Sequence, residues 1–157
     1  MISVWNALDE SVGMEISCGK APGRPPGVSN AVFMKLAAEV ATRLVEPLRA
    51  RAVMRTLVES WSPDWATFSS AKWRTQQGWT PGPNPVAGWM TYVQGERAGR
   101  RSPLPDGVIA ESVGDGLLLI AAPTAWQVDG FQLRHVRDYV ALLTAGPASS
   151  HSNRTDS

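Results

Sequence analysis

The fold is decided by the stretch Val108–Ala122, which reads VIAESVGDGLLLIAA. Two segments rich in apolar residues, Val108–Val113 and Leu117–Ala122, flank Gly114-Asp115-Gly116. A short glycine-containing link between two such segments predicts a β-hairpin. The second segment is apolar at every position, which is typical of a central strand that is covered on both faces. The sequence therefore predicts a sheet with this strand in its interior.

A helix is predicted after the hairpin. Asp129 stands where a capping side chain is needed, and the helix runs to about Thr144, before Gly146-Pro147 ends it. Arg134 and Asp138 are four residues apart, so we expect an ion pair between them. The inward positions recur at helical spacing and are Leu133, Val136, Val140 and Leu143.

Upstream of the hairpin, the sequence predicts further strands and a second main helix. Pro47 fits the first turn of a helix and Pro63 ends one, so this helix is expected from about Pro47 to Ser60. Apolar patterning predicts strands at Ile2–Leu8, Val12–Cys18, Asn30–Leu36, Trp65–Ser69 and Trp89–Gln94.

These elements together predict the α+β class, with a single, mostly antiparallel sheet and two main helices packed on it. We expect one domain over residues 1–146 and a disordered tail over residues 147–157, because the tail is polar and low in complexity. Ser70–Gly88 and Gly95–Gly107 are predicted to be loops. A structureless loop of about 20 residues inside a domain is often functional.

Composition excludes several classes of protein. Of the 157 residues, 43% are hydrophobic, which is enough for a core, but no apolar run is long enough to cross a membrane. One cysteine, Cys18, forms no internal disulfide, and with two histidines it gives no usual zinc spacing, so we expect no metal and no cofactor. A net charge of +1 argues against a dedicated nucleic-acid binder. The first ten residues lack the basic segment of a secretory signal.

Catalytic chemistry is not indicated. His135 falls in the middle of the predicted helix with no nucleophile placed near it by a motif, and Cys18 is expected to be a small buried hydrophobe. The glycines of residues 78–88 are mixed with prolines and do not open a helix, so they do not form a phosphate loop. We therefore expect a protein that is not an enzyme.

Tryptophan is in excess, with seven residues. Trp61, Trp65 and Trp89 lie in or beside predicted elements, so we expect them in the core. Trp73 and Trp79 fall in the proline-rich loop, where they either anchor a partner or fold back and pin the loop. The sequence leaves these two roles open.

The order of several motifs resembles a known family. Trp61-Ser-Pro-Asp-Trp65 is followed by Gly88-Trp89-Met-Thr-Tyr92-Val93, then Pro103-Leu-Pro105, the hairpin and the last helix. Val4-Trp5-Asn6, Cys18-Gly19 and Ser29-Asn30 stand upstream. From about Ser3 to Ala145 the chain is similar to the immunity protein 52 family of bacterial polymorphic toxin systems. Members of that family are often longer at the N-terminus, so we expect a leading segment that is shortened or absent.

The resemblance implies a cytoplasmic protein without catalysis. Such proteins bind a toxin encoded by a neighbouring gene, and the linked toxins resemble restriction-endonuclease-fold nucleases that are often delivered by type VI secretion. It implies no direct nucleic-acid or membrane partner, and a homodimer is left open. Two other hypotheses for the function remain: a tryptophan-rich binding module for a sugar or peptide, and an unrecognised enzyme.

The expected partner surface follows from charge. Residues 102–133 contain four acidic and no basic residues. A nuclease attracts phosphates, so acidic groups on an inhibitor complement its surface. We expect Asp106, Glu111 and Asp115 to face the partner, with Trp73 and Trp79 as anchors; the competing role for the acids is to keep the hairpin edge soluble.

Overall fold

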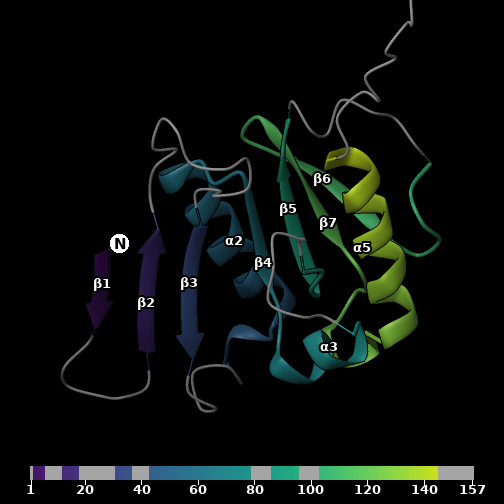
Figure 1. Cartoon of the computed structure of the whole chain (residues 1–157), viewed down its shortest axis with the longest axis horizontal. Coiled ribbons are helices and arrows are strands. Elements are labelled where there is room, and N and C mark those ends of the chain that lie inside the picture. Colours follow the sequence, from purple (N-terminus) through teal and green to yellow (C-terminus); the bar gives the residue numbers. More distant parts are fainter. Residues whose placement is uncertain are drawn as a thin grey trace, which may run out of the picture.

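A four-stranded antiparallel sheet forms the centre of the molecule (Figure 1). The computed structural model describes the backbone of residues 2–5, 12–17, 31–36, 43–78, 86–95 and 103–144, and the side chains of the last three ranges apart from residues 71 and 144. The strand order is β4-β5-β7-β6. The bounds are Trp65–Phe68 for β4, Met90–Gln94 for β5, Ile109–Val113 for β6 and Gly116–Ile120 for β7.

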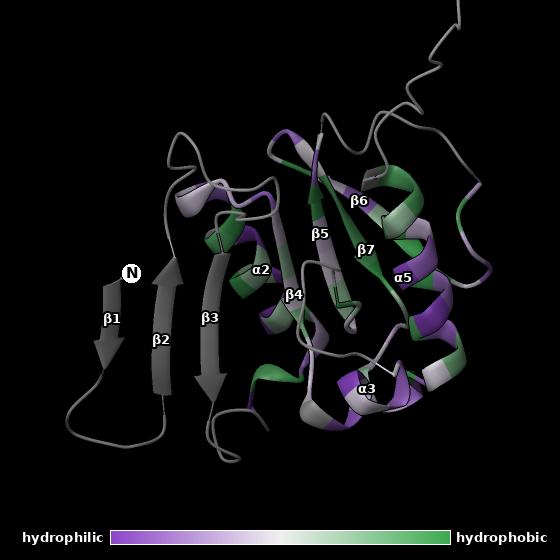
Figure 2. Cartoon of the chain, viewed as in Figure 1, coloured by the Kyte–Doolittle hydropathy of each residue, from purple (hydrophilic) through white to green (hydrophobic). Residues whose placement is uncertain are grey.

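The predicted hairpin is present, and its second strand is in the interior of the sheet. β7 pairs with both β5 and β6. Leu118, Leu119 and Ile120 are fully buried, although successive strand residues point to opposite faces. Figure 2 shows β7 as a continuous hydrophobic strand. The sheet is therefore covered on both sides, as the run of apolar residues predicts.

The cover comes from two helices on opposite faces of the sheet (Figure 1), α2 (Pro47–Trp61) and α5 (Gly130–Thr144). At the start of α2, the carboxylate of Glu46 accepts hydrogen bonds from the backbone N–H groups of Leu48 and Arg49, both at 3.1 Å. Pro47 occupies the first turn, where its missing N–H costs nothing. The predicted bounds of this helix are confirmed to within one residue.

The last helix also follows the prediction, with one correction. Asp129 caps α5 by accepting the N–H of Gln132 at 2.8 Å. The expected ion pair between Arg134 and Asp138 is wrong: Arg137 contacts Asp138 at 2.9 Å, and Arg134 donates to the carbonyl of Gln76. The four inward positions, Leu133, Val136, Val140 and Leu143, are all buried.

The tryptophans divide between core and surface. Trp89 is fully buried, donates its Nε1–H to the carbonyl of Ala122 at 2.8 Å and meets the Phe68 ring edge-on at 5.9 Å. Trp65 is half-buried. Trp61 is 42% exposed, so its predicted place in the core is wrong. It is the last residue of α2, one turn beyond the buried Val58, where the helix ends with Ser62 at φ 41°.

Part of the predicted loop Ser70–Gly88 is helical. Ser70 accepts the N–H of Trp73 at 3.2 Å and caps the short helix α3 (Ala71–Gln76). A single-turn helix η1 (Ala125–Gln127) connects β7 to α5. The prolines that led to the loop prediction all lie after residue 79, outside the described residues.

The first three strands form a second antiparallel sheet with the order β1-β2-β3. The bounds are Ile2–Trp5 for β1, Val12–Ser17 for β2 and Ala31–Leu36 for β3. In the register, Val4 is opposite Met14, which is opposite Met34. The α+β class with an antiparallel sheet and two main helices is confirmed, and the strands that the sequence places in one sheet are hydrogen-bonded in two.

Candidate functional site

The tip of the β6–β7 hairpin holds Asp115, the first of the predicted partner-facing acids. Gly114 has φ 55°, a conformation that glycine adopts without strain and that suits a two-residue hairpin turn. The carboxylate of Asp115 accepts hydrogen bonds from Gln94 Nε2 and the Tyr92 hydroxyl, each at 3.0 Å. The side chain is exposed, and these two bonds hold it against the sheet.

Those hydrogen bonds also change proton affinities. The bonds from Gln94 and then Tyr92 stabilise the charged form of Asp115, so its pKa lies below the usual value. Burial, followed by the hydrogen bond to Asp115 and its negative charge, raises the pKa of Tyr92 to about 12. Asp115 therefore carries its charge at neutral pH beside a neutral phenol.

Glu111, the second predicted acid, lies between two arginines of α2. Its carboxylate contacts Arg51 Nη1 at 3.0 Å and Arg55 Nη2 at 3.1 Å. The Glu111 side chain is only 22% exposed, so the pairing is partly shielded from solvent. The three side chains together carry a net charge of +1, and this part of the hairpin is therefore a mixed-charge surface.

Asp106, the third acid, lies in the turn before β6. The carbonyl of Pro105 accepts the N–H of Val108 at 3.1 Å and Gly107 has φ 76°, which is the pattern of a type II turn. Asp106 is exposed and forms no ion pair with a described residue. Asp106 and Asp115 lie at opposite ends of a five-residue strand, about 17 Å long at 3.4 Å per residue. The hairpin thus separates its two exposed acids.

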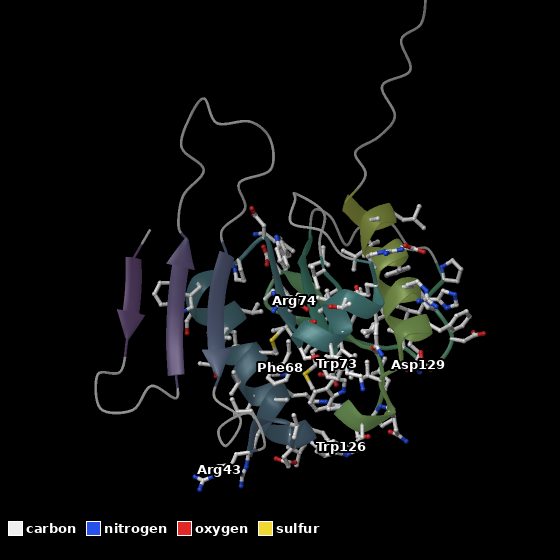
Figure 3. All side chains as sticks on the ribbon, turned by 60° about the horizontal axis from the view of Figure 1, so that its bottom comes forward. Arg43, Phe68, Trp73, Arg74, Trp126 and Asp129 are labelled. Carbon is white, nitrogen blue, oxygen red and sulfur yellow. The ribbon has the colours of Figure 1, made fainter. Side chains whose placement is uncertain are left out.

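Of the two predicted tryptophan anchors, only Trp73 falls within the described residues. It lies on α3, is half-buried and packs against the hydrophobic core. Trp73 is labelled in Figure 3, where the end of the molecule that carries α3 is turned forward. Trp79 is outside the described residues.

A buried glutamine ties α3 to the start of β5. Gln77 Nε2 donates to the carbonyls of Ala87 at 2.8 Å and Trp73 at 3.1 Å, while its Oε1 accepts the Ala87 N–H at 3.1 Å. From the other side, Arg137 donates to the carbonyl of Gln77 at 2.7 Å. These contacts fix residues 77 and 87, so the ends of the segment that contains Trp79 are held close together.

The structure exposes a set of large apolar side chains that the sequence pattern did not predict. Trp126 on η1 is 72% exposed and lies on the outside of the molecule (Figure 3). The exposure of Phe131 could have been predicted from the sequence, because this residue does not share the helical spacing of the buried residues of its helix. Among the residues that the structure describes, the other large exposed hydrophobic ones are Leu48, Leu104, Ile109, Leu142 and the already described Trp61.

The described residues include one histidine, His135. His135 is exposed, and its ring meets the ring of Phe131 at 4.1 Å and an angle of 61°. Within the described ranges, no three histidine, cysteine or acidic side chains gather as metal ligands. The part of the chain that the structure describes contains no helix with the length and apolar content for crossing a membrane.

One family model matches nearly the whole chain. The model of the family described as Immunity protein 52 covers residues 2–144. No curated protein and no solved structure matches the chain. The matched region includes all described strands and both main helices.

Proposed function

The chain belongs to the immunity protein 52 family, and from this premise we propose that it neutralises one cognate toxin by direct binding, without catalysis. The family match over residues 2–144 carries the proposal, because immunity proteins protect a cell against a toxin. In this proposal the toxin is a nuclease of the restriction-endonuclease fold, is encoded by the neighbouring gene and is delivered by type VI secretion. The complex forms in the cytoplasm.

Charge supports the β6–β7 hairpin as the partner-facing surface. A nuclease presents cationic groups to phosphates, so exposed carboxylates speed encounter and fix the orientation of the complex. Asp106 is exposed without an ion pair to a described residue, and Asp115 is exposed and ionised. We propose that these two acids contact the toxin directly.

Glu111 has a different part in this proposal. Its carboxylate is occupied by Arg51 and Arg55, so it contributes little free negative charge. It holds both guanidinium groups between α2 and β6, where their remaining N–H groups, apart from the buried Arg51 Nε, are donors for a partner's carboxylate or carbonyl. Glu111 therefore positions two donors between the two exposed acids.

Trp73 and Trp79 are retained as apolar anchors. Trp73 packs on the core and exposes only part of its ring, so its contribution to binding is limited to that part. Trp79 lies outside the described residues, two positions after Gln77, whose side chain hydrogen-bonds to Ala87.

Co-expression with the product of the neighbouring gene tests the function. We expect the protein to restore growth of cells that express this toxin and to purify with it as a complex. A toxin that kills at the same rate with and without the protein, and that does not co-purify, would contradict the proposal. Purified protein alone should not cleave nucleic acid.

The surface is tested separately by the double variant Asp106→Lys/Asp115→Lys. Reversing two charges at a complementary interface should slow association with the toxin by about tenfold at low salt and less at high salt. Glu59→Lys is the control, because Glu59 is exposed on α2 and makes no ion pair with a described residue. Equal association rates for both variants would remove the hairpin from the interface and make Trp73→Ala and Trp79→Ala the next tests.

One observation favours the second candidate function, a binding module for a sugar or peptide. Trp126 is 72% exposed, and an exposed indole is a common platform for a sugar ring. A glycan array with the wild-type protein and Trp126→Ala tests this role. Binding that disappears in the variant would favour the module over the immunity function.

A further inference from the structure

The outward face of α5 carries a self-complementary stripe. Phe131, His135, Asp138 and Leu142 are spaced by four, three and four residues, which places them along one side of a helix. All four are exposed, and the two apolar members strongly so: Phe131 is 60% and Leu142 57% exposed. The buried stripe of α5, which includes Leu133 and Val136, faces the sheet instead.

The order of the stripe has two-fold symmetry. The midpoint between Val136 and Arg137 lies halfway between Phe131 and Leu142, and also halfway between His135 and Asp138. When a second copy of α5 packs antiparallel with its axis at this midpoint, each Phe131 meets a Leu142 and each His135 meets an Asp138. The two helix dipoles then oppose each other, which is favourable.

We propose that the outward face of α5 is a homodimer interface in which two copies of the chain pack their last helices antiparallel about this midpoint. The contact is isologous, so every residue pair occurs twice. A Phe131–Leu142 pair lies at each end of the stripe, which is about 16 Å long at a helical rise of 1.5 Å per residue. Two His135–Asp138 contacts lie between them.

Among the described residues, the polar groups of the stripe keep unused hydrogen-bonding capacity. Arg137 Nε and Nη2 both contact Oδ1 of Asp138, and no described residue occupies Oδ2. His135 makes a ring contact with Phe131 and no hydrogen bond to a described residue. His135 of one copy therefore has a ready acceptor on the other, and this complementarity favours a second copy over an unrelated apolar partner.

Leu104 is a further exposed apolar residue, close in sequence to a turn that lies beside α5. It is 40% exposed and precedes the Asp106–Gly107 turn. That turn lies next to α5, since a Cβ atom at Gly107 would be 3.9 Å from Gln132 Nε2. An interface formed by one helix from each copy is small, so we expect a dissociation constant above about 1 µM.

Sedimentation equilibrium of the full chain over a range of concentrations is the first test. We expect a monomer–dimer equilibrium for the wild type. The double variant Phe131→Ser/Leu142→Ser should raise the dissociation constant at least about a hundredfold, because each change acts twice in an isologous contact. Thr56→Lys is the control, since Thr56 is exposed on α2, on the other side of the sheet.

Paired cysteines test the register. Chains with His135→Cys and chains with Asp138→Cys should form an intermolecular disulfide when they are mixed. Either variant alone should form no more disulfide than the wild-type chain, which already contains Cys18. The proposal is overturned if the wild type stays monomeric to millimolar concentration. It is also overturned if the double serine variant dimerises with the same dissociation constant as the wild type. If the wild type is monomeric and the double serine variant no longer binds the toxin, the outward face of α5 is a toxin-binding surface instead.

Discussion

The two main helices, α2 and α5, have the same length of 15 residues and cover opposite faces of one sheet, but they are held by different forces. α5 contacts the sheet through five buried hydrophobic residues, Leu133, Val136, Tyr139, Val140 and Leu143. α2 buries only Ala50, Met54 and Val58, and two of its arginines hold Glu111 of β6.

The two helices therefore contribute differently to stability and specificity. Burial of large apolar side chains is the stronger and less directional force, so α5 should supply most of the free energy of folding. Ion pairs at a partly exposed surface add little energy but depend on geometry, so they align α2 with the edge strand. Substitutions in the two helices should therefore differ in size and in their response to salt.

The largest effect is expected from the core side of α5. Leu133→Ala removes a fully buried side chain and leaves a cavity, which should lower the free energy of unfolding by about 3 kcal/mol. Leu142→Ala on the exposed side of the same helix should change the unfolding of the monomer by less than about 0.5 kcal/mol. Chemical denaturation at a concentration below dimer formation measures both. Equal effects would mean that the apolar side of α5 does not hold the helix.

An intermediate effect is expected from Tyr92, on the face of the sheet that α2 covers. Its pKa is raised from 10.0 to about 12 in the folded protein, so above pH 10 the unfolded chain loses this proton first. Stability that is fully present below pH 10 should then fall as the pH rises towards 12, by up to about 2.5 kcal/mol.

Urea unfolding of the wild type and of Tyr92→Phe at a series of pH values tests whether stability falls with rising pH because of this residue. The variant should be less stable near pH 7, because it lacks the hydrogen bond to Asp115. It should also lose less stability than the wild type between pH 10 and pH 11. A variant whose stability falls in parallel with that of the wild type would show that the Tyr92 phenol is not the group responsible.

The smallest effect is expected at the ion pairs of α2. Glu111→Ala separates β6 from Arg51 and Arg55, and it should lower the free energy of unfolding by about 1 kcal/mol at low salt. The difference from wild type should shrink in 1 M salt, because screening already weakens the pairs. Glu59→Ala is the matched control on α2. A loss of 3 kcal/mol or more would contradict the comparison and place Glu111 among the principal contacts of α2.

Local sequence patterns are sufficient to predict the central strand and the starts of the two main helices. The run Leu117–Ala122 predicts an interior strand because only a strand with two covered faces needs apolar residues at every position. Pro47 and Asp129 mark the starts of the two helices because the first turn of a helix tolerates proline and needs an acceptor for its free N–H groups. These signals are local, so the sequence alone reveals them.

Which of the predicted residues share a surface depends on tertiary packing. Glu111 looks like part of an acidic patch along the chain, yet it meets Arg51 and Arg55, which lie 60 and 56 residues away in sequence. Trp61 and Trp89 look equally apolar, but only Trp89 lies between packed elements. The division of the strands into two sheets likewise depends on long-range pairing. Contacts of this kind are set by how the helices and strands pack, and no local pattern specifies them.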